Sequence, residues 1–211
     1  MKIQKIEPPR FPVDLREETF ELIEDEAFYE NCLFKNCTLT GRDLEKVCFQ
    51  SVQFVNVTFS DCHFHQLELL DVEFIKCNLS NTEMIGGILH RCAFLDSKIV
   101  GVNFAESSIL DTTFKDCQAN YSSFSYASLK RVSFTDMPLI ESDFFNIKWL
   151  HLTFNACDLT GVNLMQTNLK GLNLSTSSFE KINLSIELLR GCKINPEQSI
   201  VIAGALGCIV E

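Results

Sequence analysis

The residues of this sequence with the clearest potential for chemistry are the run Cys62-His63-Phe64-His65. A thiolate and two imidazoles are donors that zinc prefers. In an extended chain, however, Cys62 and Phe64 point to one side while His63 and His65 point to the other. Because the three donors cannot converge on one ion, and because the sequence has no CxxC pair, we expect no metal site.

Paired carboxylates suited to acid–base catalysis are also present, but their expected surroundings are unfavourable. Asp43 and Glu45 flank Leu44, and the repeat described below places both on a convex wall without a cleft to shift a pKa. No GxSxG motif or phosphate-binding loop occurs, and Gly86-Gly87 falls where a corner of the chain is expected. We therefore expect walls without pockets, no enzymatic activity and no cofactor.

These residues belong to a five-residue repeat that runs from Phe34 to Leu189 without an insertion or deletion. Of the 32 positions in this register, 27 hold Phe or Leu. Two residues before each of them lies a second column, in which 24 of 32 positions hold Cys, Val, Ser, Thr, Ala or Gly. Residues two apart point to the same side of an extended chain, so each unit places one large and one small side chain inward.

The period of five determines the expected architecture. It excludes an α-helix, whose turn of about 3.6 residues would carry the large side chains steadily around the axis. It also disfavours a hairpin meander, since no turn signals recur at intervals of about ten residues. Identical residues recur instead every twenty positions, at Phe34, Phe54, Phe74, Phe94, Phe114, Phe134 and Phe154. The sequence therefore predicts an all-β fold, a quadrilateral (four-sided) parallel β-helix of about eight coils.

The register divides the chain into three segments. Residues 31–194 form the β-helix, and residues 1–30 form an N-terminal capping segment, which an open solenoid end requires. Residues 195–211 form a short C-terminal α-helix and tail, with a typical helix start at Asn195-Pro196-Glu197. Because this helix is apolar on all sides and must be covered, we expect a homodimer through the C-terminus. The expected interface residues are Ile200, Val201, Ala205, Leu206, Ile209 and Val210.

Composition restricts the partners and the compartment. The formal net charge is −10, and an acidic protein is not expected to bind nucleic acid directly, because phosphate contacts need Lys and Arg. Eight of the ten cysteines fall in the small inward column, which predicts free buried thiols in a reducing compartment. Since we find no signal-peptide or membrane-spanning stretch, we expect a cytoplasmic protein that does not contact a membrane.

Three acidic residues are spaced so that they form a strip. Asp96, Asp116 and Asp136 are twenty residues apart, so they are expected at one corner of three consecutive coils. Like charges about 5 Å apart repel, which a protein selected for stability alone would tend to avoid. The strip is therefore a candidate binding surface for a basic partner. A merely solvated column remains the alternative, since water screens the repulsion.

The repeat units resemble a known family. Cys157-Asp158-Leu159-Thr160-Gly161 is similar to the consensus of the pentapeptide-repeat family, and the resemblance extends over nearly three quarters of the chain. Two stretches are similar to the Qnr quinolone-resistance proteins, especially the chromosomal Qnr proteins of Gram-positive cocci such as the enterococcal one. These stretches are Trp149 with Thr153-Phe154-Asn155-Ala156-Cys157-Asp158-Leu159-Thr160, and the tail Ala205-Leu206-Gly207-Cys208-Ile209-Val210.

The resemblance implies a right-handed, dimeric rod that mimics duplex DNA and binds DNA gyrase, with topoisomerase IV as a second candidate. Such a protein would inhibit supercoiling, protect the enzyme from fluoroquinolones, or do both. The plasmid-borne Qnr proteins carry two loops that interrupt the repeat, and the register from Phe34 to Leu189 leaves no room for them. Gyrase inhibition is therefore favoured over strong protection. The alternative is a structural or scaffolding repeat protein with an unrelated protein partner.

Overall fold

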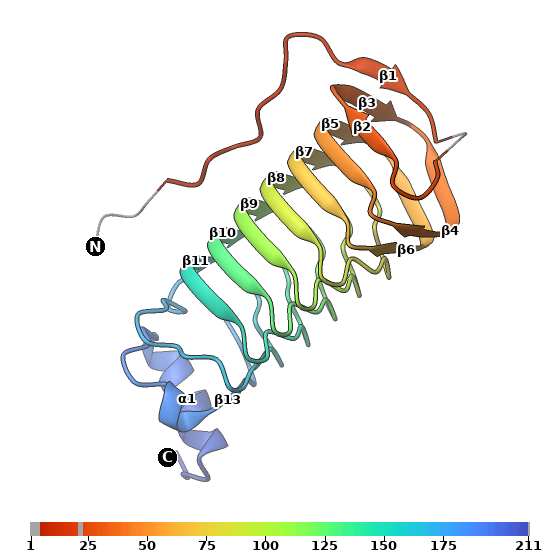
Figure 1. Cartoon of the computed structure of the whole chain (residues 1–211). Helices are drawn as coiled ribbons and strands as arrows, with labels where there is room; N and C mark the ends of the chain where they lie inside the picture. The colour runs from red at the N-terminus through yellow and green to blue at the C-terminus, as the bar shows by residue number, and fades with distance from the viewer. Residues whose placement is uncertain (1–4, 21–22, 211) are drawn as a thin grey trace.

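The protein, seen in a computed structural model that describes residues 5–20 and 23–210, is a rod wound from parallel strands (Figure 1). Its longest strands have eight residues and follow one another along the rod. The strands are β1 (Arg16–Glu18), β2 (Phe28–Glu30), β3 (Cys32–Lys35), β4 (Thr38–Glu45), β5 (Cys48–Val55), β6 (Thr58–His65), β7 (Glu68–Ile75), β8 (Ile88–Leu95), β9 (Ser108–Lys115), β10 (Ser128–Thr135), β11 (Lys148–Asn155), β12 (Asn163–Leu164) and β13 (Asn183–Leu184). The helical elements are a 3₁₀ turn, η1 (Ile186–Leu188), and α1 (Pro196–Ala205).

Strands that neighbour each other in space lie twenty residues apart in the repeat. The main sheet has the order β1-β3-β5-β7-β8-β9-β10-β11, with β2 also paired to β5. Its pairs are parallel, as where Phe114 lies opposite Phe134 and Phe134 opposite Phe154. β4 and β6 pair in the same way on another side. This register confirms the right-handed, four-sided parallel β-helix of about eight coils, with one short α-helix at the C-terminal end.

Most corners of the coil are made by a residue with positive φ. Such residues recur every five positions, as at Asp96 (55°), Gly101 (66°), Glu106 (61°) and Asp111 (51°). Glycine adopts this left-handed region freely, and Asn and Asp adopt it more readily than other residues. The corner positions therefore explain part of the Asn, Asp and Gly content of the repeat.

The large inward side chains form a continuous aromatic stack along the rod axis. The rings of Phe74, Phe94, Phe114 and Phe134 are stacked at centroid distances of 4.6–4.8 Å, with interplanar angles of 8–11°. All four side chains are at most 2% exposed. A step of twenty residues advances the chain by one coil, about 4.8 Å, which is the reason that the same residue recurs at this interval.

The small inward column holds most of the cysteines. All ten cysteines are free thiols, and of the eight predicted to point inward, six are buried while Cys37 and Cys192 are half-buried. Burial raises the pKa of Cys92 to about 12 and that of Cys117 to about 11, because an apolar environment disfavours the thiolate. These thiols therefore stay protonated at neutral pH and pack as small apolar side chains.

One polar side chain of this small inward column lacks a hydrogen bond. The Thr82 hydroxyl is fully buried and has no hydrogen-bond partner among the described residues. We expect Thr82→Val, which replaces the hydroxyl by a methyl group of similar size, to raise the free energy of unfolding by about 1 kcal/mol, since an unpaired buried hydroxyl is costly. Urea unfolding measures this change. Thr112→Val is the control and should not stabilise, because the Thr112 hydroxyl donates to the Leu110 carbonyl at 3.1 Å.

The two ends of the coil are covered differently. At the first coil, β1 pairs with β3 and the Phe20 ring stacks on Phe34 at 4.4 Å; residues 1–4 and 21–22 of the predicted cap lie outside the described part. At the last coil, Asn195 and Gln198 form the capping box of α1. The Gln198 amide also donates to the carbonyls of Leu174 and Ser177 at 2.9 and 2.8 Å, which fixes the helix on the rod.

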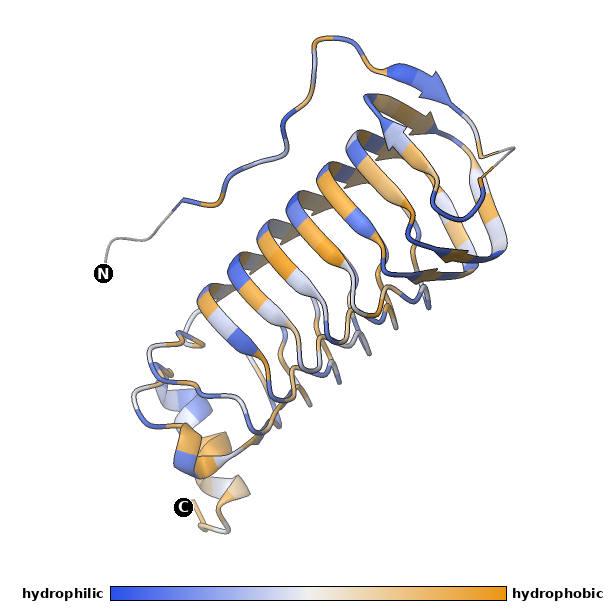
Figure 2. Ribbon diagram, viewed as in Figure 1, coloured by the Kyte–Doolittle hydropathy of each residue, from blue (hydrophilic) through white to orange (hydrophobic). Residues whose placement is uncertain are grey.

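The N-terminal segment, residues 5–15, leaves the first coil and runs back along the outside of the rod (Figure 1). No residue of this segment is fully buried. In Figure 2 hydrophilic and hydrophobic residues follow one another along the segment without the repeat that marks strands β5 to β11. It is therefore held by contacts other than the five-residue pattern.

Candidate functional site

The predicted acidic strip lies on one corner of three successive coils. Asp96, Asp116 and Asp136 are all exposed, and the N–H of each donates to a carbonyl of the next coil at 3.0–3.1 Å. The three residues are thus one coil apart, about 4.8 Å. The same corner carries Lys76 in the coil before them and Ala156 in the coil after them, so the strip is three coils long.

The surroundings of this strip weaken its negative charge. The Lys115 ammonium lies 3.8 Å from the Asp116 carboxylate, and Lys98 is exposed two residues after Asp96. All three aspartates also have φ between 54° and 55°, a conformation that aspartate tolerates better than most residues. Both readings of the strip, as a binding surface and as a structural corner, are therefore compatible with its geometry.

A larger acidic surface lies on the side of the rod that contains β4 and β6. It comprises this side and its two bordering corners, and we call it the acidic face. Its outward column is in register from coil to coil, since Asp43 lies opposite His63, His63 opposite Glu83, and Ser123 opposite Asp143. The acidic residues of the face are Asp43, Glu45, Asp61, Glu83, Glu106, Glu141 and Asp143, all exposed or half-buried.

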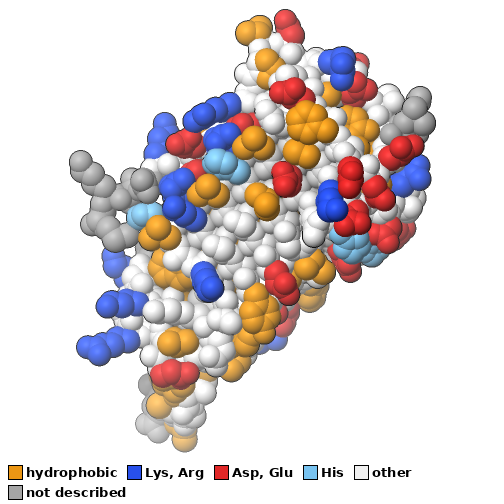
Figure 3. All heavy atoms as spheres, in the orientation of Figure 1, with side chains coloured by type: hydrophobic (Ala, Val, Ile, Leu, Met, Phe, Trp, Pro, Cys, Tyr) orange, Lys and Arg blue, Asp and Glu red, His pale blue; other side chains and the backbone are white. Residues whose placement is uncertain are grey.

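The acidic face contains most of the negative charge excess of the repeat. Residues 34–189 hold 17 acidic and 12 basic side chains. Seven of the acidic side chains lie on the acidic face, but only three of the basic ones do, namely Arg42, Lys46 and Lys181. Figure 3 shows Asp and Glu gathered over β4 and β6, whereas Lys and Arg gather along the opposite edge of the view. We did not predict this surface from the sequence; summing the charge over the neighbouring twenty-residue columns of one side and its two corners would have indicated it.

A third charged column, the Asp/Arg ladder, is buried and neutral. It consists of Asp71, Arg91, Asp111 and Arg131 at one corner of four successive coils. Arg91 donates two hydrogen bonds to Asp71 at 2.6 and 2.7 Å, and Arg131 donates two to Asp111 at 2.6 and 2.5 Å. The four side chains are between 1% and 15% exposed. Because its charges cancel, the ladder adds nothing to the acidic surface.

The histidines of the Cys62-His63-Phe64-His65 run belong to the acidic face. Cys62 is fully buried, while His63 and His65 are exposed and lie 3.1 and 3.0 Å from the carboxylates of Glu83 and Asp43. No group of three or more His, Cys, Asp and Glu residues in the described part of the chain could hold a metal ion. The two histidines therefore pair with acidic neighbours.

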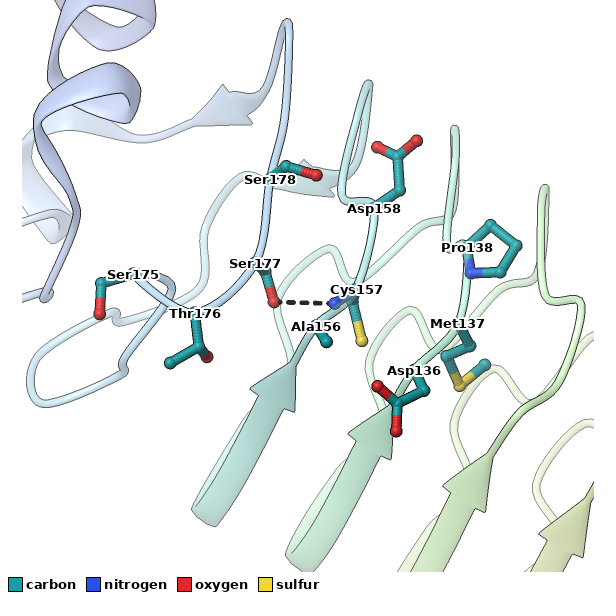
Figure 4. Close-up of a pocket in the computed structure, with 10 residues that line it drawn as sticks. All are labelled: Asp136, Met137, Pro138, Ala156, Cys157, Asp158, Ser175, Thr176, Ser177 and Ser178. Carbon is teal, nitrogen blue, oxygen red and sulfur yellow. Dashed lines mark hydrogen bonds between the residues drawn. The ribbon is translucent and has the colours of Figure 1, made fainter.

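The walls of the rod are not entirely smooth, which corrects the expectation of walls without pockets. Near the last coil, an open hollow of about 560 Å³ is lined by residues that include Asp136, Cys157 and Asp158 (Figure 4). At this corner the Ala156 N–H donates to the carbonyl of Thr176, which lies twenty residues later in the chain. In the preceding coil the Asp136 N–H donates to the carbonyl of Asn155, which lies nineteen residues later. Thr176 also lacks the positive φ found at most other corners.

The contents of this hollow do not form a catalytic group. Ser177 accepts a hydrogen bond from the Cys157 N–H at 3.2 Å, and burial raises the pKa of the Cys157 thiol to about 11. Figure 4 shows the carboxylates of Asp136 and Asp158 on different sides of the hollow, pointing away from a common centre. Among the residues drawn there, no nucleophile is paired with a base.

The C-terminal end presents the apolar residues that the sequence analysis assigned to an interface. Ile202 faces the rod and is 6% exposed, whereas Ile200, Leu206, Ile209 and Val210 are 53, 49, 90 and 51% exposed. Val201 is half-buried and Ala205 is exposed. The structure therefore leaves one side of this end uncovered. Within the described residues, no helix combines the length and apolar character needed to cross a membrane.

Two solved structures are among those that this chain matches. A trypsin-treated form of QnrB1, a plasmid-mediated fluoroquinolone resistance protein, is 21% identical, with 94% of this chain and 97% of that chain covered and a TM-score of 0.46. HetL, a pentapeptide repeat protein involved in heterocyst differentiation regulation from the cyanobacterium Nostoc sp. strain PCC 7120, is 14% identical. The comparison with HetL covers 80% of this chain and 87% of that chain, with a TM-score of 0.41.

Comparisons of sequence are more decisive. The protein YisX of Bacillus subtilis (strain 168), itself uncharacterised, is 36% identical over 206 residues, which is 97% of both chains. Residues 27–104 and 87–164 match the family described as a pentapeptide repeat region, and residues 153–185 match the pentapeptide repeats. Together these matches include almost the whole coil, and the chain belongs to the pentapeptide-repeat family.

Proposed function

We propose that this protein binds DNA gyrase by presenting a surface that resembles duplex DNA, and that it inhibits supercoiling. Topoisomerase IV, a related enzyme, is a second candidate target. The observation that carries the proposal is the acidic face, in which seven carboxylates are spread over one side of the rod and its two bordering corners. The similarity of the Trp149 segment and of the C-terminal tail to the Qnr proteins supports gyrase as the partner.

The dimensions of the rod support this proposal. One side of the coil has five residues, about 16 Å at the rise of a β-strand, which approaches the width of a DNA duplex. Its carboxylates recur at intervals of one or more coils of about 4.8 Å, and an enzyme surface built to neutralise phosphates offers Lys and Arg to such a column. Complementary charge of this kind accelerates encounter and fixes the orientation of the partners.

A supercoiling assay with purified gyrase, with and without ciprofloxacin, tests the function. We expect the protein to inhibit supercoiling at micromolar concentration, and to give some relief from ciprofloxacin at lower concentration. The absence of both effects at tens of micromolar would exclude gyrase as the partner. The alternative, a scaffolding protein with an unrelated partner, predicts that result together with an intact, folded rod.

Two sets of charge-neutralising substitutions locate the contact. We expect Glu83→Gln with Glu106→Gln, Glu141→Gln and Asp143→Asn to weaken gyrase binding roughly 10- to 100-fold, because each exposed ion pair contributes about 0.2–1 kcal/mol. The comparison set is Asp96→Asn with Asp116→Asn and Asp136→Asn, which should weaken binding less, since it removes three carboxylates instead of four. Surface plasmon resonance at two salt concentrations measures both. Unchanged binding in either set removes that surface from the proposal.

We also propose that the protein is a homodimer joined through its C-terminal end. The exposed Leu206, Ile209 and Val210 form an apolar surface there, and apolar burial is the main driving force for such association. We expect Leu206→Asp with Ile209→Asp to convert the dimer to a monomer without changing the melting of the coil. Sedimentation equilibrium measures the mass. A monomeric wild-type protein at micromolar concentration would contradict the proposal.

A further inference from the structure

The N-terminal segment is attached to the Asp/Arg ladder by its backbone. The N–H of Glu7 donates to the Asp111 carboxylate at 3.2 Å, and the N–H of Arg10 donates to the Asp71 carboxylate at 3.0 Å. These contacts join residues 104 and 61 positions apart in sequence. The segment thus runs along the ladder, toward the first coil, as Figure 1 shows.

The two residues between these donors are prolines. In Glu7-Pro8-Pro9-Arg10, neither proline has an N–H, so the only backbone donors of the four residues are the two that meet the ladder. Proline also fixes φ near −65° and restricts the residue before it to extended conformations. The sequence therefore holds the two donors apart on a stiff, extended stretch of polyproline II type.

The spacing of the donors matches the spacing of the acceptors. Asp71 and Asp111 are two coils apart, about 9.6 Å at the separation of neighbouring strands. Three residues of a polyproline II helix span about 9.3 Å. A segment with N–H groups at the first and fourth positions can therefore reach both carboxylates without bending.

The acceptors form a built site that does not depend on the segment for its charge balance. Each carboxylate is held by two hydrogen bonds from its arginine, and the Asp111 side chain is 1% exposed. The segment, in contrast, contributes no buried side chain, and Glu7 and Arg10 are exposed. The segment is therefore recognised through its backbone N–H groups and through the stiffness that the prolines provide.

We propose that the Asp/Arg ladder is a peptide-binding site that takes X-Pro-Pro-X segments in the polyproline II conformation, and that the N-terminal segment is its intramolecular occupant. The ligand class is an extended peptide with a free N–H on each side of a Pro-Pro pair. The covalent link keeps the resident segment at a high effective concentration, so that a second such peptide competes only when the segment is released. The site lies apart from the acidic face and does not rest on gyrase binding.

Removing the two donors from the full chain tests the proposal. Glu7→Pro with Arg10→Pro deletes both N–H groups and leaves the ladder intact. We expect this variant, labelled with ¹⁵N, to bind a synthetic peptide of sequence Lys-Ile-Glu-Pro-Pro-Arg-Phe-Pro, with shifts of the Asp71 and Asp111 amide resonances. The titration extends to about 5 mM, since two hydrogen bonds support a Kd near 1 mM. The wild-type protein should bind the peptide at least tenfold more weakly.

Two controls keep the result specific. A peptide with proline at both donor positions should not bind, and Val13→Pro, at a fully exposed residue, should behave as wild type. In the wild-type protein, hydrogen exchange should be slower at the Glu7 and Arg10 amides than at Val13. The proposal is overturned if these two amides exchange as in a free peptide, if the variant binds nothing, or if the donor-free peptide binds equally well.

Discussion

Replacing Phe94 by alanine should lower the free energy of unfolding by about 3–5 kcal/mol, the usual cost of removing a buried phenylalanine. Phe94 is fully buried, and its ring stacks on Phe74 at 4.6 Å and on Phe114 at 4.7 Å. The substitution interrupts the aromatic stack at its middle. The two flanking coils then lose part of their common interface, which in a solenoid carries the coupling between neighbouring repeats.

Urea unfolding followed by circular dichroism measures this effect. Phe145→Ala is the matched control, since Phe145 points outward, is half-buried and contacts Tyr126 at a centroid distance of 5.4 Å. We expect it to cost about 1 kcal/mol, the contribution of an aromatic pair. A loss below about 1 kcal/mol for Phe94→Ala would mean that the stack does not carry the stability of the coil.

Breaking the ladder at Asp111 should be almost as damaging. Asp111→Ala leaves the Arg131 guanidinium, 15% exposed, without its carboxylate, and removing one partner of a buried ion pair costs about 3–5 kcal/mol. Asp111→Ala with Arg131→Ala should be less damaging than the sum of the single substitutions, because no unpaired charge remains. A double-mutant cycle from urea unfolding gives the coupling, and a coupling near zero would contradict the role of the pair.

The same pair makes stability depend on pH. Burial alone would raise the pKa of Asp111, but the hydrogen bonds from Arg131 and the Glu7 N–H, with the charge of Arg131, outweigh it and hold the pKa below its usual value. A carboxyl whose pKa is lower in the folded state stabilises above the unfolded pKa, near 3.9. This stability is lost as the pH falls through the folded pKa. Acid titration should therefore destabilise the wild-type protein more steeply than Asp111→Ala.

The sequence was sufficient to predict the coil because every unit repeats the same physical requirement. The positions of Phe74, Phe94 and Phe114 follow from one register, and the neighbour of each is another coil in the same conformation. The corner position of Asp96, Asp116 and Asp136 follows for the same reason. Within the repeat, local sequence and spatial neighbourhood are linked by the fixed interval of twenty residues.

The features that we did not predict lie where the local sequence does not determine the spatial neighbours. The N-terminal segment contacts Asp71 and Asp111, but its sequence has no repeat to indicate which coil it meets. The acidic face combines two corners and one side, so no single column contains it. The hollow near Cys157 lies where the hydrogen bond of the Ala156 N–H shifts by one residue, to the Thr176 carbonyl, a local change that the inward pattern does not reveal.

The twenty-residue coil also restricts the length that the rod can have. Its length can change only in steps of about 4.8 Å, and a whole coil can be added or removed without turning any side of the rod away from its partner. Surfaces that depend on continuity, such as the acidic face, tolerate such a step. A contact that requires a fixed separation does not tolerate it. Without residues 91–110, Asp71 and Asp111 would lie in adjacent coils, too close for the fixed span of Glu7-Pro8-Pro9-Arg10.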